Sequence, residues 1–150
     1  MNKKEFEREL NHLKLNDKVD SFELLLKHTL SMNEKFNLTA IKDEEKFREL
    51  MIIDSLLPLN LISFDDKKVI DIGTGAGYPG LPLAIASTGE FTLLDSTKKK
   101  IDQINEFASS QKLTNVKTVS ARAEEYASSH REEFDIGIAR SEERRVGKEC

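Results

Sequence analysis

Three glycines at alternate positions are the residues whose type and spacing say most about the chemistry of this chain. Gly73, Gly75 and Gly77 follow the β-branched run 69–72 and precede a helix-forming segment. Glycine adopts positive φ readily and has no Cβ, so a ligand can lie directly against the backbone where a parallel strand ends. This stretch therefore predicts a turn that holds a nucleotide.

A second candidate is Asp95, which ends the next β-rich run, 90–94. A carboxylate at the tip of the neighbouring strand can accept hydrogen bonds from both hydroxyls of a ribose. Asp95 could instead cap the helix that residues 97–100 would begin. Its pairing with an upstream glycine turn favours the ribose interpretation.

The spacing of the glycines separates two classes of cofactor. The dinucleotide fingerprint G-x-G-x-x-G would need a glycine at position 78, where this chain has Tyr78. An NAD-dependent dehydrogenase is therefore the weaker alternative. A G-x-G-x-G turn with an acidic residue, Asp71, two places before its first glycine resembles motif I of the class I S-adenosylmethionine (SAM) methyltransferases. That resemblance implies SAM as the cofactor.

The first part of the chain is helical in pattern. Residues 3–15 and 17–33 have helical spacing, and a third helix is expected between Asp43 and Pro58. The expected apolar faces are Phe22, Leu25, Leu26 and Leu30 in the second helix and Phe47, Leu50, Met51 and Leu57 in the third. We expect residues 1–60 to form an N-terminal helical cap packed on a sheet.

From Lys67 onward the pattern alternates between strand and helix, which is typical of a parallel α/β sheet. Strands are expected at 69–72, 91–94, 116–119 and 134–139, and helices at 81–87, at 98–113 and near Ala123. The long helix has an apolar stripe of Ile101, Ile104, Phe107 and Ala108. Right-handed crossovers would bring Gly73, Asp95 and the segment after Val119 to one carboxyl edge.

Composition favours a single intracellular α/β domain, because 38% of the 150 residues are hydrophobic and 33% are charged. The first residues lack the apolar region of a signal peptide, and no run approaches the roughly 20 apolar residues of a membrane span. We therefore expect a cytoplasmic protein with no membrane partner. The only cysteine is Cys150 and the histidines lack ligand spacing, so no metal is expected.

The formal net charge of −4 argues against a protein that coats nucleic acid. A local basic patch is still present at Lys98, Lys99 and Lys100. It could contact RNA, or it could be the solvated first turn of a helix.

Four segments together resemble the RsmG family, also called GidB. In chain order they are Asn37-Leu38-Thr39-Ala40, Ile53-Asp54-Ser55-Leu56, the turn from Gly73 to Leu83, and Leu94-Asp95-Ser96. Members of this family are bacterial methyltransferases that use SAM to make a 7-methylguanosine in 16S ribosomal RNA. The resemblance covers about residues 33–140. It implies a Rossmann-like class I SAM-dependent methyltransferase fold, with residues 61–140 as the SAM-binding α/β core.

The resemblance also implies the partner and the binding residues. The partner would be 16S ribosomal RNA or the small ribosomal subunit, and we expect a monomer. The implied cofactor-binding residues are Gly73, Gly75, Gly77 and Tyr78 in the turn, Asp95 at the ribose, Ala123 and Glu124 beside the adenine, and Arg140 after the fourth strand.

The residue types are compatible with these roles. An arginine such as Arg140 presents a planar fork of donors that can reach a carboxylate or phosphate. Tyr78 could line the pocket with its ring or pack in the core, and the resemblance favours the pocket. Glu124 alone would fit a solvated helix residue, and its place beside the other strand tips favours binding.

The chemistry implied by the resemblance needs no general base, because N7 of guanine carries an in-plane lone pair and no proton. Catalysis would come mainly from aligning that nitrogen with the methyl group. No residue is identified as a catalytic acid or base. Two alternatives remain, a SAM-dependent enzyme acting on a small molecule and a nucleotide-binding module without catalysis.

Two segments depart from the family pattern. Leu50 and Met51 stand where the family commonly has a basic residue and a histidine. The charged segment 141–150 stands where the family continues into another helix and further strands. We expect that segment to be a non-native tail and the sheet to be incomplete at its C-terminal side.

Overall fold

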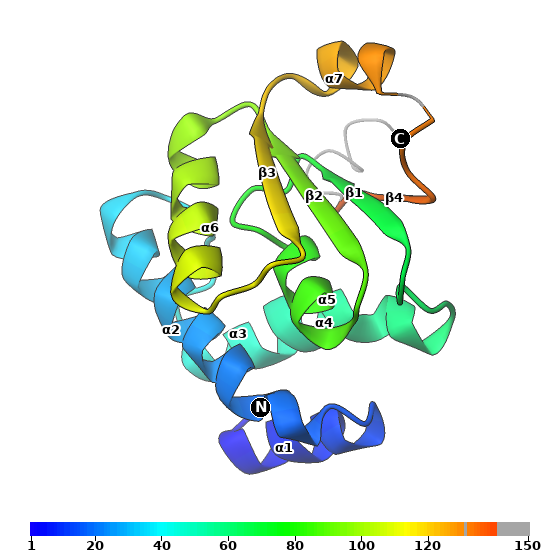
Figure 1. Cartoon of the computed structure of the whole chain (residues 1–150). Helices are drawn as coiled ribbons and strands as arrows, with labels where there is room; N and C mark the ends of the chain where they lie inside the picture. Colours follow the sequence, from blue (N-terminus) through cyan, green and yellow to red (C-terminus); the bar gives the residue numbers. More distant parts are fainter. Residues whose placement is uncertain (131, 141–150) are drawn as a thin grey trace, which may run out of the picture.

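Helices come first in the chain and are followed by alternating strands and helices (Figure 1). The computed structural model describes residues 1–130 and 132–140, so the expected tail lies outside the described residues. The main elements are α1 (Lys3–His12), α2 (Val19–Lys35), α3 (Glu44–Phe47), α4 (Asp54–Leu56), β1 (Lys68–Ile72), α5 (Gly80–Ala86), β2 (Glu90–Asp95), α6 (Lys98–Ser110), β3 (Val116–Ser120), α7 (Ala123–Ser129) and β4 (Ile136–Ile138).

The described strands form one parallel sheet in the order β3-β2-β1-β4. The chain moves outward from β1 through β2 to β3 and then crosses to the other side of β1. Ligands of open α/β sheets bind in the crevice where the strand order reverses, outside the carboxyl ends of the strands. Here the strand order reverses between β1 and β4. The predicted strands and helices of this part are confirmed, although β4 is shorter than expected.

A capping box begins the first of the N-terminal helices, and a buried ion pair joins two of the others. Asn2 and Glu5 form a capping box that begins α1. Arg48 donates to both carboxylate oxygens of Glu23 in α2, at 2.8 and 2.9 Å. This bidentate contact raises the pKa of Arg48, and both side chains are buried. The pair fixes residues 44–56, the third helical segment, against α2.

The third helical segment differs from the predicted helix. Between α3 and α4 the chain forms a π-helix over Arg48–Ile53, whose turns are wider than those of an α-helix. The predicted apolar face is wrong at two positions, since Leu50 and Leu57 are 45% and 49% exposed. The wider turn shifts the inward face, and Ile52 and Leu56 are fully buried in their place.

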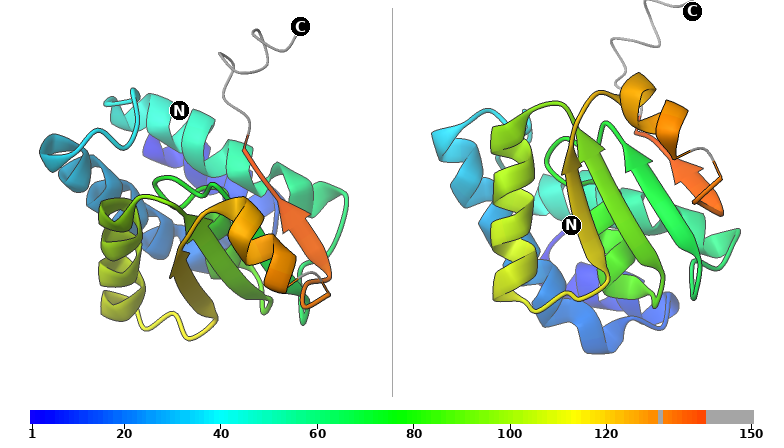
Figure 2. Two further views of the ribbon diagram at one scale, coloured as in Figure 1. Left: turned by 90° about the horizontal axis from the view of Figure 1, so that it is seen from above. Right: turned by 45° about the horizontal axis from the view of Figure 1, so that its top comes forward.

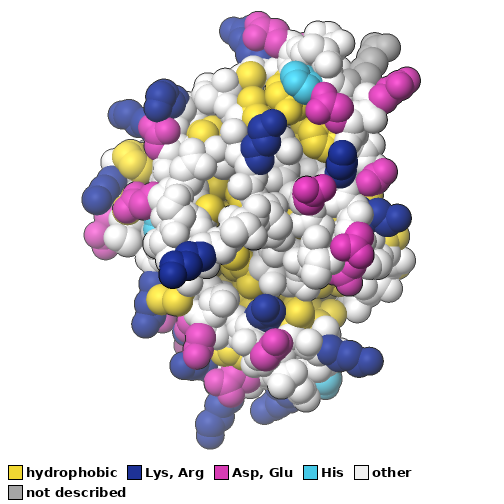
Figure 3. All heavy atoms as spheres, viewed as in Figure 1, with side chains coloured by type: hydrophobic (Ala, Val, Ile, Leu, Met, Phe, Trp, Pro, Cys, Tyr) yellow, Lys and Arg dark blue, Asp and Glu magenta, His cyan; other side chains and the backbone are white. Residues whose placement is uncertain are grey.

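The two faces of the sheet are covered unequally. One face packs on a large cluster to which α2, the third helical segment, α5 and α6 contribute. The predicted stripe of α2 lies in or against this cluster, as do Ile101, Ile104 and Phe107 of the α6 stripe; Ala108 is also buried. The other face carries a small cluster of Ile70, Leu94 and Tyr126, under α7 (Figure 2). Hydrophobic side chains are visible beside α7 in Figure 3, among interspersed positive and negative charges.

The large cluster contains residues of both 1–60 and 61–140, such as Phe22 from α2 and Leu93 from β2. Burying large apolar side chains of this kind stabilises a fold by about 1.5–3 kcal/mol each. The helical segment and the sheet therefore share one core. Within residues 1–130 and 132–140, no helix has the length and apolar character needed to cross a membrane.

Candidate functional site

The glycine turn lies at the carboxyl end of β1, and all three glycines have positive φ. The values are +68° for Gly73, +59° for Gly75 and +108° for Gly77. A Cβ at position 73 or 75 would meet nothing within 4 Å, whereas at position 77 it would lie 2.6 Å from Leu81 Cδ1. Gly77 is thus needed for close packing, while Gly73 and Gly75 present bare backbone to open space. That open backbone is what a ligand cradle requires.

Asp95 ends β2 and connects two parts of this edge. Its Oδ2 accepts a hydrogen bond from the Gly75 amide at 2.8 Å, and its Oδ1 accepts one from the Thr97 amide at 2.9 Å. The second bond does not make Asp95 the N-cap of α6, because the N-cap is Thr97. The first places the carboxylate at the glycine turn, as the ribose interpretation requires. Each carboxylate oxygen can accept a further hydrogen bond.

Asp71 lies inside the sheet, fully buried, two residues before the turn. Its Oδ2 accepts hydrogen bonds from the Thr74 hydroxyl and the Gly80 amide, both at 2.8 Å. Its Oδ1 is buried and has no hydrogen-bond partner among the described residues. Burial is the main cause that raises the pKa of Asp71 to about 7; Asp95 raises it further, whereas the two hydrogen bonds and Arg140 lower it.

Arg140 follows β4 and reaches back to the N-terminal helices. Its Nη2 donates to the Leu50 carbonyl in the π-helix at 2.7 Å and lies 3.6 Å from Asp54 Oδ2. Its Nη1 is buried without a hydrogen-bond partner in the described part of the chain. The carboxyl edge therefore holds two buried polar atoms of opposite character, Asp71 Oδ1 and Arg140 Nη1, with spare hydrogen-bonding capacity.

Comparison with known families identifies the chain. Residues 18–144 match the family model described as GidB, rRNA small subunit methyltransferase G. The chain belongs to the GidB family. The segments that carry the sequence resemblance, from 37 to 96, all lie within the matched range.

Curated relatives in the GidB family have the name ribosomal RNA small subunit methyltransferase G. The relative from Fusobacterium nucleatum is 41% identical over 139 residues, which cover 90% of this chain and 60% of the relative. Those from Clostridium perfringens and Oenococcus oeni are 43% and 40% identical and are covered over 54% and 62% of their lengths. The chain thus spans little more than half the length of these relatives.

Solved structures support the fold of this GidB family member. A SAM-dependent methyltransferase from Agrobacterium tumefaciens has a TM-score of 0.51 at 22% identity, covering 67% of this chain and 34% of that one. A point mutant of MtNAS has a TM-score of 0.52 at 15% identity, covering 93% of this chain and 55% of that one. The chain has the Rossmann-like class I methyltransferase fold predicted from its sequence.

The ring of Tyr78 does not line an open pocket. It is only 2% exposed, packs edge-on against Phe47 at 5.7 Å between ring centroids, and its hydroxyl is 2.9 Å from the Thr29 hydroxyl. Burial raises the pKa of the Tyr78 phenol. The ring therefore packs in the core and does not line a pocket, because it turns inward against α2 and α3, and Pro79 and α5 follow it. A cofactor role for Tyr78 stays a prediction.

Ala123 and Glu124 begin α7, just beyond the tip of β3. The exit of β3 is tied to the site, since the Ala121 amide donates to the Asp95 carbonyl at 3.0 Å. Ala123 is half-buried and packs on the small cluster of Ile70, Leu94 and Tyr126, whereas Glu124 is exposed. Ala123 thus offers an apolar contact near the turn, and their adenine role stays a prediction.

Two site residues were missed as functional candidates. Asp71 was noted as part of the motif, but a charged residue inside an apolar strand was itself a signal of function. Gln103 in α6 is 2% exposed and donates to the Ala76 carbonyl inside the turn at 2.9 Å. The sequence signal for Gln103 is weaker. Gln103 precedes Phe107 by one helical turn, so it is a polar residue at the border of the apolar stripe of α6.

Proposed function

We propose that this chain carries the cofactor site of a SAM-dependent methyltransferase that forms 7-methylguanosine in 16S ribosomal RNA. The single observation that carries the proposal is the Asp95 carboxylate bonded to the Gly75 amide, at the tip of the neighbouring strand. Membership of the GidB family supports the reaction and the RNA substrate. Because the chain spans 60% of its Fusobacterium relative, the activity of the whole protein is part of the proposal.

The polar atoms of the edge fit the functional groups of SAM. Asp95 would accept hydrogen bonds from the ribose hydroxyls, and the bare backbone of Gly73 and Gly75 would lie under the nucleoside. Asp71 Oδ1 and Arg140 Nη1 are buried and have no hydrogen-bond partner among residues 1–130 and 132–140. They match an ammonium and a carboxylate, the two charged groups of the amino-acid part of SAM. Ala123 would supply an apolar contact for the adenine and Glu124 would lie at its edge.

The chemistry follows from positioning. When bound, SAM supplies a methyl group on a sulfonium, and the guanine N7 lone pair attacks that carbon as the carbon–sulfur bond breaks. The residues named above hold and orient the cofactor, and none of them takes up a proton. The rate would come from alignment of the reacting atoms, which can contribute about 7–11 kcal/mol.

Several further features belong to the same proposal. We propose that residues 1–60 act as a helical cap on the α/β core 61–140, that the protein works as a monomer, and that the small ribosomal subunit is its partner in the cytoplasm. The mixed charges in Figure 3 suit a protein that contacts RNA locally rather than over its whole surface.

Calorimetric titration with SAM and, separately, with NAD tests the site. We expect SAM binding by the folded chain and a loss of at least about 100-fold in Asp95→Ala, because hydrogen bonds to a charged acceptor are worth about 1.5–3 kcal/mol each. Asp135→Ala is the matched control, since Asp135 also bonds a backbone amide, that of Lys68 at 2.9 Å, but at the amino end of β1. NAD binding in place of SAM would contradict the proposal.

Transfer of a labelled methyl group then tests the substrate. Small ribosomal subunits that lack the modification, naked 16S RNA and guanosine would be compared as acceptors. Incorporation at guanine N7 of the subunit or its RNA supports the proposal. Methylation of guanosine alone, or SAM binding without transfer to any acceptor, would favour the small-molecule enzyme or the binding module instead.

A further inference from the structure

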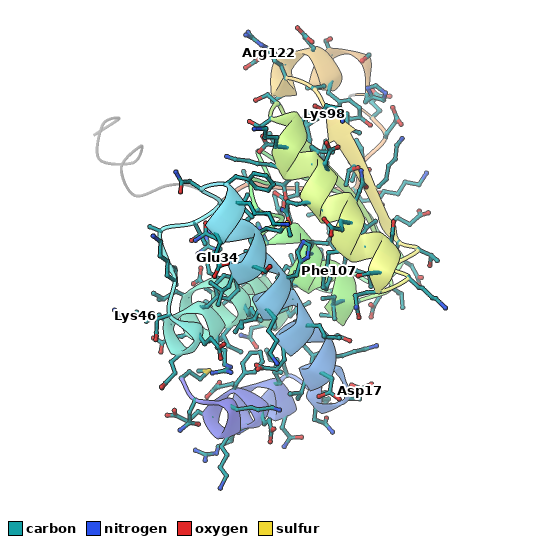
Figure 4. The ribbon with its side chains drawn as sticks, turned by 90° about the vertical axis from the view of Figure 1, so that its left-hand side faces the viewer. Asp17, Glu34, Lys46, Lys98, Phe107 and Arg122 are labelled. Atoms are coloured by element: carbon teal, nitrogen blue, oxygen red, sulfur yellow. The ribbon has the colours of Figure 1, made fainter. Side chains whose placement is uncertain are left out.

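A hydrogen-bonded chain, partly buried at His28 and buried at Gln103, links helix α2 to the glycine turn through α6. His28 Nε2 lies 2.9 Å from Gln103 Oε1 and 3.0 Å from the Gln103 backbone carbonyl. The Gln103 side-chain amide then donates to the Ala76 carbonyl at 2.9 Å. Figure 4 shows α2 running beside α6, with Phe107 on the α6 side of their contact.

The chemistry of the three groups fixes the direction of this chain. A backbone carbonyl only accepts, so the amide nitrogen of Gln103 must face Ala76 and its oxygen must face His28. His28 must therefore carry its proton on Nε2. The His28 ring is further fixed by Phe107, at 5.3 Å between ring centroids. One arrangement of protons satisfies every member, so the network holds Gln103 in a single orientation.

The next residue of α2 makes a second contact with the same turn. The Thr29 hydroxyl is fully buried and lies 2.9 Å from the Tyr78 hydroxyl. Two consecutive residues of α2 thus contact the turn on either side of Gly77: His28 reaches Ala76 through Gln103, and Thr29 contacts Tyr78 directly. The third contact, from Asp95 to the Gly75 amide, lies on the ligand side of the turn.

These contacts matter because the turn is made of residues with many backbone conformations. Gly75 and Gly77 flank Ala76, and glycine loses more conformational freedom on ordering than other residues. A turn that is already ordered binds its ligand without that entropic cost. The buried amide of Gln103 is the one side-chain group that holds the carbonyl between the two glycines, among the described residues.

We propose that Gln103, oriented by His28, is a positioning residue that holds the glycine turn in its ligand-binding conformation. Its ligand, SAM, rests on the proposed function. The conformation of the turn can be measured without any ligand, so the two claims can fail separately. The N-terminal helices would then act on the site through hydrogen bonds as well as through packing.

The test compares two amide side chains that hold carbonyls at opposite ends of the sheet. Gln103→Met keeps the side-chain volume and removes the bond to Ala76. Asn115→Leu is the matched control, because the Asn115 amide donates to the Ala84 and Gly89 carbonyls at 3.0 and 2.9 Å, before β3 begins. His28→Phe keeps a ring on Phe107 and leaves Gln103 able to donate.

Amide hydrogen exchange by NMR, without ligand, is the first readout. The Gly77 and Tyr78 amides, which donate to the Thr74 carbonyl, should exchange about tenfold faster in Gln103→Met than in Asn115→Leu at equal global stability. His28→Phe should give a smaller increase. Equal exchange in Gln103→Met and the control would overturn the proposal, whether or not SAM binds.

SAM affinity by calorimetry is the second readout. We expect Kd to rise about tenfold in Gln103→Met and to stay unchanged in Asn115→Leu, although both variants lower Tm. An unchanged Kd in Gln103→Met would reduce Gln103 to a stabilising residue and overturn its positioning role. A wild-type chain that binds no SAM would refute the proposed function, while the exchange rates would still decide the role of Gln103.

Discussion

The two ends of the parallel sheet use buried and loop polar groups in different ways. At the amino end, Asn115 holds the carbonyls of Ala84 and Gly89, and Asp135 accepts from the Lys68 amide. At the carboxyl end, Asp71 and Arg140 each keep one buried atom without a partner in the described residues. Polar groups at the amino end join loops together, whereas those at the carboxyl end retain capacity for something else.

The difference teaches where the fold tolerates incomplete pairing. A buried polar atom without a partner costs about 1–3 kcal/mol, so a fold retains such atoms where another molecule can complete them. The strand order also reverses between β1 and β4, and ligands of open α/β sheets bind at the carboxyl ends of the strands beside such a point. Polar groups that complete the fold and polar groups with spare hydrogen-bonding capacity thus lie at opposite ends of one sheet.

The largest expected effect concerns the charge of Asp71. The unfolded chain ionises this group near 3.8, whereas in the folded chain its pKa is raised to about 7. The stability that this group contributes is complete below pH 3.8 and is lost as the pH rises to about 7. Asp71→Asn is neutral at every pH and should gain about 4 kcal/mol relative to wild type across this range.

Urea unfolding of both proteins between pH 4 and pH 8 measures this difference. Parallel stability curves would show that folding does not raise the pKa of Asp71. The contrast between the two ends of the sheet would then no longer be supported by Asp71.

A glycine at each end gives the next largest effect. A Cβ on Gly80 would lie 2.8 Å from Asp71 Oδ2 and 2.9 Å from Leu93 Cγ, and one on Gly89 would meet the Phe64 backbone oxygen. Gly80→Ala and Gly89→Ala should each lower stability by about 2–3 kcal/mol. Only Gly80→Ala should also weaken SAM binding, because it displaces Asp71. Equal losses of affinity in both variants would remove the distinction between the ends.

The contact between Tyr78 and Thr29 should give a smaller effect. Tyr78→Phe leaves the buried Thr29 hydroxyl without its partner and should cost about 1–2 kcal/mol in unfolding free energy. Adding Thr29→Val should cost less than the sum of the single changes, because each single change already removes the same bond. Chemical denaturation of the four proteins of this cycle checks the coupling, and strict additivity would contradict it.

The smallest effect is expected at the basic patch. Lys98 Nζ lies 3.0 Å from Asp102 Oδ2, and the two side chains are 78% and 57% exposed. Lys98→Ala should therefore change the free energy of unfolding by at most about 0.5 kcal/mol. Lys98 lies at the same end of the molecule as Arg122, as Figure 4 shows. If thermal unfolding of Lys98→Ala shows a loss of stability greater than about 0.5 kcal/mol, the basic patch has a structural role. The RNA affinity of the same variant tests the predicted contact with RNA.

Local patterns predicted most of the α/β part because its strands are short, rich in apolar or β-branched residues, and separated by helix-forming segments. The glycine turn and Asp95 were found because their types and spacing are themselves the signal. Thr29 and Gln103 were not, since a polar residue on a helix acquires its role only from the neighbour that tertiary packing supplies. Sequence spacing also placed Leu50 inside, because it assumes the period of an α-helix throughout.

The irregular winding of the π-helix Arg48–Ile53 also supplies an acceptor for a residue that is distant in sequence. The Asp54 amide donates to the Glu49 carbonyl, five residues back, so this turn holds one residue more than an α-helical turn would. Deleting one residue from it would restore the regular bonds between residues four apart and leave the direction of Asp54 nearly unchanged. The Leu50 carbonyl would then be drawn back into a regular turn and away from Arg140 Nη2.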